Sequence, residues 1–90
     1  MSAPDGRRFA PIDNIEIRTR LESRVGPILK ASREDSDMSQ EDLAARMGWT
    51  RNMIANLESG RKSVRLVDFV MISKPLGIDP ERLLRRILQW

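Results

Sequence analysis

The sequence predicts a small all-α protein with five helices packed into one compact domain. Three observations lead to this fold class. The chain has 90 residues, which is short for more than one hydrophobic core. Apolar residues recur at helical spacing between breaks made by glycine and proline. Residues at those breaks, including Ser39, Thr50 and Asp79, are of the types that cap helix N-termini.

The N-terminal quarter of the chain is predicted as an extension, residues 1–22, of a domain formed by residues 23–90. Residues 1–11 contain two prolines and one glycine and are predicted to be a flexible arm. The stretch 12–24 fits two structures, because its apolar and charged residues alternate as in a half-buried strand but also share a helical face. We favour the helix, since a lone strand needs another chain for its partner.

The first two helices of the domain have clear boundaries in the sequence. A helix is expected over Ser23–Asp35, with Pro27 in its first turn, where the missing N–H costs little. The next helix is expected over residues 40–47. Ser39 is the predicted N-cap, and Gly48 suits a left-handed C-cap.

Three more helices complete the domain. One is expected over residues 51–59 with Thr50 as its cap, another over 66–74, and a C-terminal helix over 80–89. Only a three-residue linker separates the second helix from the third. Two short helices joined in this way form a helix–turn–helix, here over about 40–59, whose second member enters the DNA major groove.

Composition excludes several classes of function. The chain has no cysteine and no histidine, so it lacks disulfides, thiolate nucleophiles, imidazole bases and the ligands of structural zinc sites. We therefore expect no catalytic residue, no metal and no cofactor, and we do not expect an enzyme. No apolar run approaches the roughly 20 residues of a membrane span, so we expect a cytoplasmic protein without a membrane partner.

Charge lies in blocks along the chain, whose net charge is +3. Every charged residue between positions 34 and 45 is acidic. Residues 46–65 carry a single acidic residue, Glu58, against the basic residues Arg46, Arg51, Arg61, Lys62 and Arg65. The basic block slightly favours a nucleic-acid partner, although a solvated surface with salt bridges would give a similar total.

Several motifs in register carry a family resemblance. They are Ser-Gln before an apolar-Ala pair, glycine at the turn, a hydroxyl cap, Ile-x-x-Leu-Glu-x-Gly over 54–60, and Leu-Gly-Ile-Asp-Pro-Glu-x-Leu-Leu over 76–84. From about Val25 to Leu84 the chain resembles the Cro/C1-type, or XRE-type, helix–turn–helix of phage repressors and bacterial regulators. The resemblance implies a lambda-repressor-like domain and a repressor-like, sequence-specific transcriptional regulator that binds double-stranded DNA.

The resemblance also assigns residues to the DNA. Arg51, Asn52 and Asn56 align with base-reading positions, which suits the chemistry of arginine with guanine and asparagine with adenine. Ala55 is either a contact to a thymine methyl group or a good helix former. Phosphate contacts are implied for Gln40, Thr50, Arg61, Lys62 and Arg65. The alternatives are a solvated polar helix face, a second cap for the helix that Gln40 begins, and an ordinary exposed loop.

An ion pair between Arg33 and Glu58 is implied by the family, in which an arginine late in the first helix pairs with a glutamate ending the third. The pair would orient the third helix. The sequence departs from the family at Trp49, where valine or isoleucine is usual, and at the residues before the fourth helix. Pro75 replaces an alanine, and we expect the fourth helix to end early or bend there.

The predicted fifth helix is crowded with apolar residues. A domain this small cannot easily bury both sides of such a helix. We therefore expect Leu84, Leu88 and Trp90 to form a two-fold homodimer contact, together with residues 12–22. The dimer would place two third helices about 34 Å apart, which matches the half-sites of a pseudo-palindromic operator. The alternative is a helix that only completes the monomer core, with Trp90 packed loosely.

A second class of function stays open. The same fold serves in antitoxins, which neutralise a toxin or other protein partner through their termini and usually bind their own operator as well. On the N-terminal arm, Arg7 and Arg8 either enter a minor groove or belong to a disordered tail.

Overall fold

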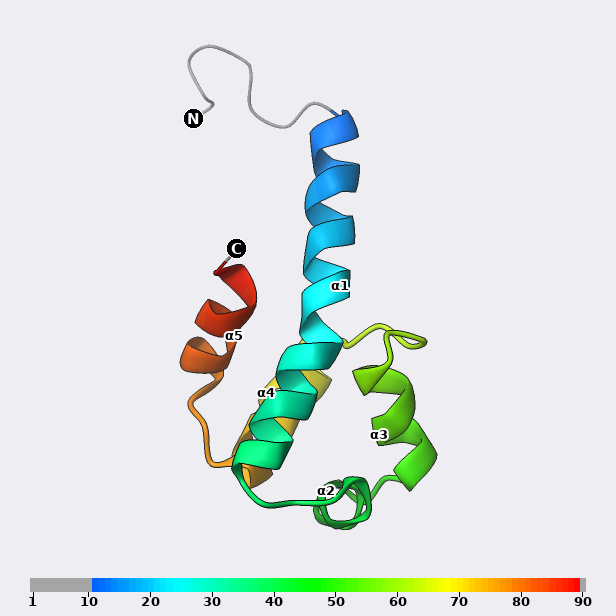
Figure 1. Ribbon diagram of the computed structural model, residues 1–90, viewed down its shortest axis with the longest axis vertical. Coiled ribbons are helices and arrows are strands. Elements are labelled where there is room, and N and C mark those ends of the chain that lie inside the picture. Colours follow the sequence, from blue (N-terminus) through cyan, green and yellow to red (C-terminus); the bar gives the residue numbers. More distant parts are fainter. Residues whose placement is uncertain (1–10, 90) are drawn as a thin grey trace.

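The structure is a computed structural model that describes residues 11–89, and over these residues its only regular secondary structure is helical. In chain order the helices are α1 (Pro11–Asp35), α2 (Gln40–Met47), α3 (Arg51–Glu58), α4 (Leu66–Leu76) and α5 (Pro80–Leu88). Four of them gather around the C-terminal half of α1, whose N-terminal half projects away from the others (Figure 1). The predicted five-helix, all-α fold is confirmed. Residues 1–10 of the predicted arm, with Arg7 and Arg8, and the terminal Trp90 lie outside the described residues, and Pro11, the last residue of the predicted arm, begins α1 instead.

Helix α1 begins earlier than predicted. The stretch 12–22 is helical, as favoured, but the start predicted at Ser23 is wrong because one helix runs continuously through it. The division at residue 22 therefore falls inside α1. Between Pro11 and Pro27 the sequence has a single glycine, Gly26, and exposed pairs of opposite charge four residues apart support the projecting half.

Pro27 lies inside α1 and not in a first turn, which corrects the predicted position. The Pro27 ring is exposed, so the backbone hydrogen bond that proline cannot donate is missing on the solvent-facing side of the helix. The axis of α1 changes direction partway along, as expected for a proline in a helix interior (Figure 1). The helix continues because Leu29, two residues later, is buried in the core.

The capping predictions for α2, α3 and α5 are confirmed. The Ser39 hydroxyl accepts the Asp42 N–H at 3.0 Å, and the Asp42 carboxylate accepts the Ser39 N–H at 3.0 Å. Gly48 ends α2 with φ 71°. Thr50 caps α3 by accepting the Met53 N–H at 3.2 Å, and Asp79 caps α5. Short local bonds therefore set the ends of these helices.

Helix α4 corrects a further prediction. It runs to Leu76, through Pro75, and does not end early. Pro75 stands in the last turn, where one lost backbone bond is tolerated because Leu76 is buried and Gly77 closes the helix with φ 66°. At its start, Arg65 provides no side-chain cap.

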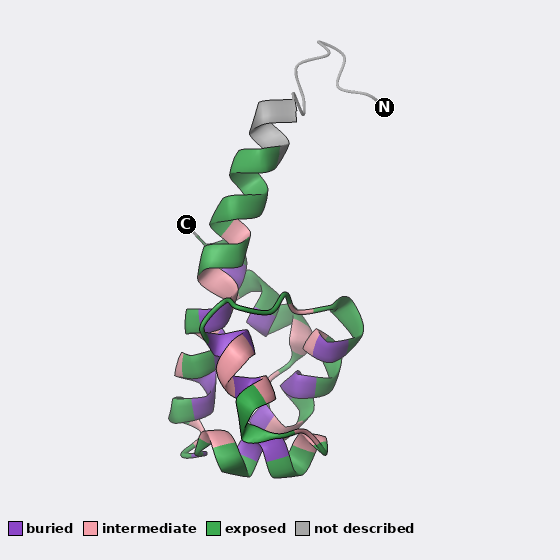
Figure 2. Cartoon of the chain, turned by 90° about the vertical axis from the view of Figure 1, so that its right-hand side faces the viewer, coloured by how far each residue is buried: buried purple, intermediate pink, exposed green. Residues whose placement is uncertain are grey.

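The core takes one fully buried apolar side chain from each helix. Leu29, Leu43, Ile54, Ile72 and Leu83 are each at most 1% exposed. Figure 2 shows the buried residues on the inward sides of the packed helices, while residues 15–20 in the projecting part of α1 are exposed. The Trp49 ring is partly buried against this core, so the larger side chain is accommodated at its edge. No helix in the described part of the chain has the length and apolar character needed to cross a membrane.

Gly26 marks a close approach of α1 to α3. A Cβ atom there would overlap the backbone carbonyl oxygen of Glu58, at the end of α3. In a helix interior, replacing glycine by alanine normally raises the free energy of unfolding by about 1 kcal/mol. At this position we expect Gly26→Ala instead to lower the free energy of unfolding by about 1–3 kcal/mol, because the helices must separate.

Thermal unfolding followed by circular dichroism checks this expectation. Lys30→Ala, at an exposed position of the same helix, is the control and should leave Tm nearly unchanged. An unchanged or raised Tm for Gly26→Ala would show that the contact between the two helices is not tight.

Candidate nucleic-acid interface

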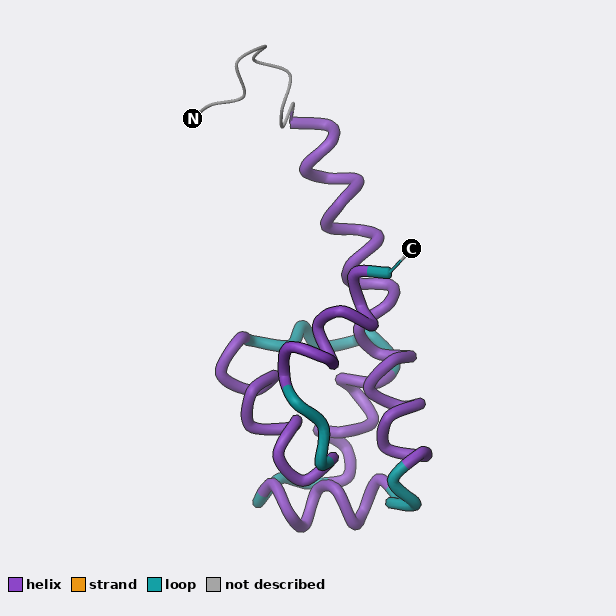
Figure 3. The backbone as a smooth tube through the Cα atoms, turned by 90° about the vertical axis from the view of Figure 1, so that its left-hand side faces the viewer, coloured by secondary structure: helices purple, strands orange, loops and turns teal. Residues whose placement is uncertain are grey.

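Helices α2 and α3 form the helix–turn–helix, with a turn of three residues between them (Figure 3). Ala44 of α2 is buried in the core, where its small side chain allows close packing. Its carbonyl oxygen accepts the Trp49 N–H at 2.9 Å, so the turn folds back on the end of α2. The turn thereby sets the direction in which α3 leaves.

Helix α3 has one buried and one accessible side. Ile54 and Leu57 are at most 3% exposed and face the core. The predicted base-reading residues lie elsewhere on the helix: Arg51 and Asn52 are exposed, while Ala55 and Asn56 are half-buried. Neither asparagine side chain makes a hydrogen bond to another described residue. Their amide groups are therefore available to a ligand.

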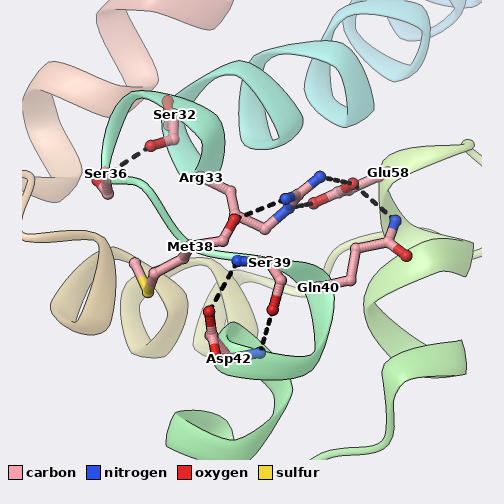
Figure 4. A network of polar contacts seen from close by, with 8 residues as sticks. All are labelled: Ser32, Arg33, Ser36, Met38, Ser39, Gln40, Asp42 and Glu58. Atoms are coloured by element: carbon pink, nitrogen blue, oxygen red, sulfur yellow. Dashed lines mark hydrogen bonds and ion pairs between the residues drawn. The ribbon is translucent and has the colours of Figure 1, made fainter.

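The structure brings Arg33 and Glu58 together as a buried ion pair joining α1 to α3 (Figure 4). Arg33 Nε donates to Glu58 Oε2 at 2.7 Å, and Nη2 donates to Oε1 at 3.1 Å. A third bond runs from Arg33 Nη1 to the carbonyl oxygen of Met38 at 2.7 Å. The hydrogen bond to Glu58 raises the pKa of Arg33 above its usual value. One guanidinium thus connects α1, the loop before α2 and the end of α3.

Gln40, the first residue of α2, extends this network toward the surface (Figure 4). Its Nε2 donates to Glu58 Oε1 at 3.1 Å, which leaves the second N–H of the amide. The alternative role as a cap is taken by other residues, because Ser39 and Asp42 cap α2. Hydrogen bonds from the backbone and side chain of Ser39 lower the pKa of the Asp42 carboxyl. The N-terminus of α2 therefore presents the Gln40 side-chain amide, which Glu58 holds in place, beside the backbone N–H groups of the helix.

The other residues predicted to contact phosphate lie on or after α3. Thr50 is exposed and already serves as the α3 cap. Arg61 and Lys62 are exposed in the loop that follows α3. Arg65 Nε lies 3.1 Å from Asp68 Oδ2, and this hydrogen bond lowers the pKa of Asp68. The Arg65 side chain is still 73% exposed, so its charge remains at the surface.

One contact between α2 and α3 was missed from the sequence. Arg51 Nε lies 3.5 Å from Glu41 Oε2, so the predicted base reader is paired with a carboxylate in the first turn of α2. Opposite charges at the starts of two successive helices were the available signal. Their meeting depends on the angle between the helices, which the sequence pattern does not specify.

The apolar side chains of α5 fall into an exposed pair, which includes two of the predicted dimer residues, and a buried pair. Leu84 and Leu88 are 46% and 47% exposed, whereas Leu83 and Ile87 complete the monomer core. Arg24 of α1 holds the end of α5 by donating to the carbonyl oxygens of residues 86 and 87. Sequence reasoning missed a second group of exposed apolar side chains, on α4: Leu66, Val67, Val70 and Met71.

Comparisons with known proteins identify the family. Residues 29–83 match a family model described as helix-turn-helix, which spans more than half of the chain. The chain belongs to the Cro/C1-type, or XRE, helix–turn–helix family. Residues 29–83 include all of α2, α3 and α4, and this XRE-family chain is a DNA-binding transcription regulator.

Two similar curated proteins are control proteins. The chain is 39% identical over 59 residues to control protein C.MunI from Mycoplasma sp, covering 64% of this chain and 80% of that protein. It is 43% identical over 49 residues to control protein C.BamHI from Bacillus amyloliquefaciens, covering 54% of this chain and 60% of that protein. The chain thus matches less than two thirds of the second protein.

Solved structures share the fold. The clp gene regulator ClgR from Corynebacterium glutamicum superposes with a TM-score of 0.71 at 24% identity, covering 76% of this chain and 88% of that one. The restriction-modification controller protein C.AhdI from Aeromonas hydrophila superposes with a TM-score of 0.64 at 29% identity, covering 73% of this chain and 97% of that one.

The buried pair leads to a stability prediction. Glu58→Ala should lower the free energy of unfolding by about 3–5 kcal/mol, because the Arg33 charge stays buried without its partner. Asn56→Ala, two residues earlier in α3, should change it by less than about 1 kcal/mol, since its amide has no partner among the described residues. Urea unfolding of the two variants provides the comparison. Equal losses of stability would contradict a structural role for the pair.

Proposed function

We propose that this XRE-family chain binds a pseudo-palindromic operator as a homodimer and regulates transcription in a repressor-like, sequence-specific manner. The observation that carries the proposal is the arrangement of α3. Its apolar side is buried and its end is anchored by Glu58, while Arg51 and Asn52 are exposed. The control proteins among its relatives support a role at a restriction-modification locus.

In this proposal the accessible side of α3 reads base edges. Arginine donates two hydrogen bonds to O6 and N7 of guanine, and asparagine pairs with N6 and N7 of adenine. We assign the first chemistry to Arg51 and the second to Asn52 and Asn56. Ala55, half-buried between them, suits contact with a thymine methyl group. Each such contact is worth about 1–3 kcal/mol of discrimination.

Residues on either side of α3 supply contacts to phosphate in the same proposal. The N–H of Gln40 that does not bond to Glu58, together with the N-terminus of α2, suits a phosphate oxygen. The Thr50 hydroxyl oxygen accepts the capping bond from the Met53 N–H, and its O–H is left to donate to a phosphate oxygen. Arg61, Lys62 and Arg65 are exposed cations that add affinity without base information.

The proposed homodimer uses the apolar surface of α5. Leu84 and Leu88 are large side chains that the monomer leaves about half exposed, and Trp90 follows them in the sequence. Contiguous exposed apolar surface of this kind typically marks an interaction site. A two-fold contact there would present two copies of α3 to half-sites about 34 Å apart.

The proposal includes no catalytic role and no cofactor, and it locates the protein in the cytoplasm with its DNA. The alternative function as an antitoxin would require a protein partner, such as a toxin. The relatives with control-protein names favour the regulator.

Selection of bound fragments from random duplexes tests the proposed division of roles. Arg51→Ala and Asn52→Ala should each relax the preference at particular positions of the selected site by about ten- to a hundredfold, while the fold stays intact. Lys62→Ala should weaken binding to all duplexes alike and reduce the salt dependence by about one unit. The selection is read at two salt concentrations. The same profile for Arg51→Ala and Lys62→Ala would overturn the assignment of Arg51 to bases.

The dimer is tested by sedimentation at micromolar concentration. The wild-type chain should sediment as a dimer, and Leu84→Glu should give a 10.4 kDa monomer because a carboxylate would be buried in the contact. Arg82→Glu is the control, since it places the same carboxylate on roughly the opposite side of α5. A monomeric wild-type chain would end the dimer proposal.

A further inference from the structure

The Arg51–Glu41 pair occupies an unusual place on the surface. It joins the first turn of α2 to the first residue of α3, with Arg51 Nε 3.5 Å from Glu41 Oε2. Both side chains are largely exposed, at 57% for Arg51 and 68% for Glu41. The exposed Asn52 follows directly. A carboxylate therefore stands beside the side of α3 that is proposed to enter a strongly negative groove.

The other tasks near the start of α2 are carried out by different residues. Ser39 and Asp42 form the capping box. Gln40 donates to Glu58. Glu41 takes part in neither arrangement, and its ion pair is made with Arg51. Its negative charge suits the positive end of the α2 dipole, but the acidic Asp42 in the same turn supplies that interaction as well.

We propose that Glu41 is a specificity-determining residue, which compensates the charge of Arg51 wherever the protein is bound to DNA other than its operator. The inference rests on the proposed function, in which Arg51 reads guanine. Non-specific binding is dominated by cations that neutralise phosphates and release counterions. With Glu41 beside it, Arg51 adds little to that attraction. The operator restores the contribution, because guanine offers two acceptors in the geometry of a guanidinium fork.

The exposure of the pair makes this exchange feasible. An ion pair between exposed side chains is weak, so guanine can displace the Glu41 carboxylate from Arg51 at little cost. On other duplexes the pair with Arg51 keeps the Glu41 carboxylate within a Debye length, about 8–10 Å, of the phosphates, whereas on the operator Glu41 is released from Arg51 and its exposed side chain can turn toward solvent. Discrimination thus comes from a penalty on wrong sequences that the correct sequence offsets.

Binding of the full chain to two duplexes tests the inference. One duplex carries the selected operator, and the other has the same length and composition in scrambled order. Glu41→Gln should raise affinity for the scrambled duplex about three- to tenfold and steepen its salt slope by about 0.9. It should raise operator affinity less than about twofold, so the ratio of the two affinities falls. Fluorescence anisotropy at two salt concentrations measures all four values.

Glu34→Gln is the matched control, because it removes an exposed carboxylate from the same acidic block without touching Arg51. It should change both affinities alike. In the Arg51→Ala background, Glu41→Gln should no longer change the ratio, since the pair is already broken.

Two outcomes would overturn the inference. An equal rise for both duplexes would mean that Glu41 acts only through net charge. A fall in operator affinity would mean that the carboxylate aids operator binding, either by orienting Arg51 or by accepting a hydrogen bond from a cytosine amino group. Failure of the proposed function is distinguishable, because Arg51→Ala would then leave base preference unchanged. If Arg51→Ala relaxes preference while Glu41→Gln leaves the ratio intact, only the role of Glu41 is wrong.

Discussion

The buried ion pair between Arg33 and Glu58 is the constraint on which the rest of the interface depends. Removing two charges from water is costly, and the cost is offset only where each charge is well paired. Arg33 meets this condition with bonds to both Glu58 oxygens and to the Met38 carbonyl. The three bonds tie the end of α3 to α1 and to the loop before α2. A shift of α3 would break both bonds to Glu58 together, so the helix is held in one orientation.

This constraint extends from the core to the surface that is proposed to contact DNA. Glu58 also accepts a hydrogen bond from Gln40, so the residue that anchors α3 also restrains an amide at the start of α2. The close approach at Gly26 brings α1 against the same end of α3. With its C-terminal end fixed, α3 keeps Ile54 in the core and leaves Asn52 exposed. The two sides of one short helix therefore perform different tasks.

Predictions from the sequence were correct where the bonds are local and wrong where packing outweighs a local preference. The caps at Ser39, Thr50 and Asp79 were predicted because each bonds to a backbone N–H two or three residues ahead. Pro27 was placed in a first turn and Pro75 at an early end, yet both lie inside helices. In each case a buried leucine follows within two residues, and its packing outweighs one lost backbone bond.

The sequence by itself determined the helical class, the caps and the positions on α3 that resemble base-reading residues, because these depend on spacing within a few residues. Only the tertiary structure decided which distant side chains meet. Glu41 reaches Arg51, and Gln40 reaches Glu58, because α2 packs across α3 at one angle. That angle results from the shapes of buried side chains from all five helices, and no pattern along the chain encodes it locally.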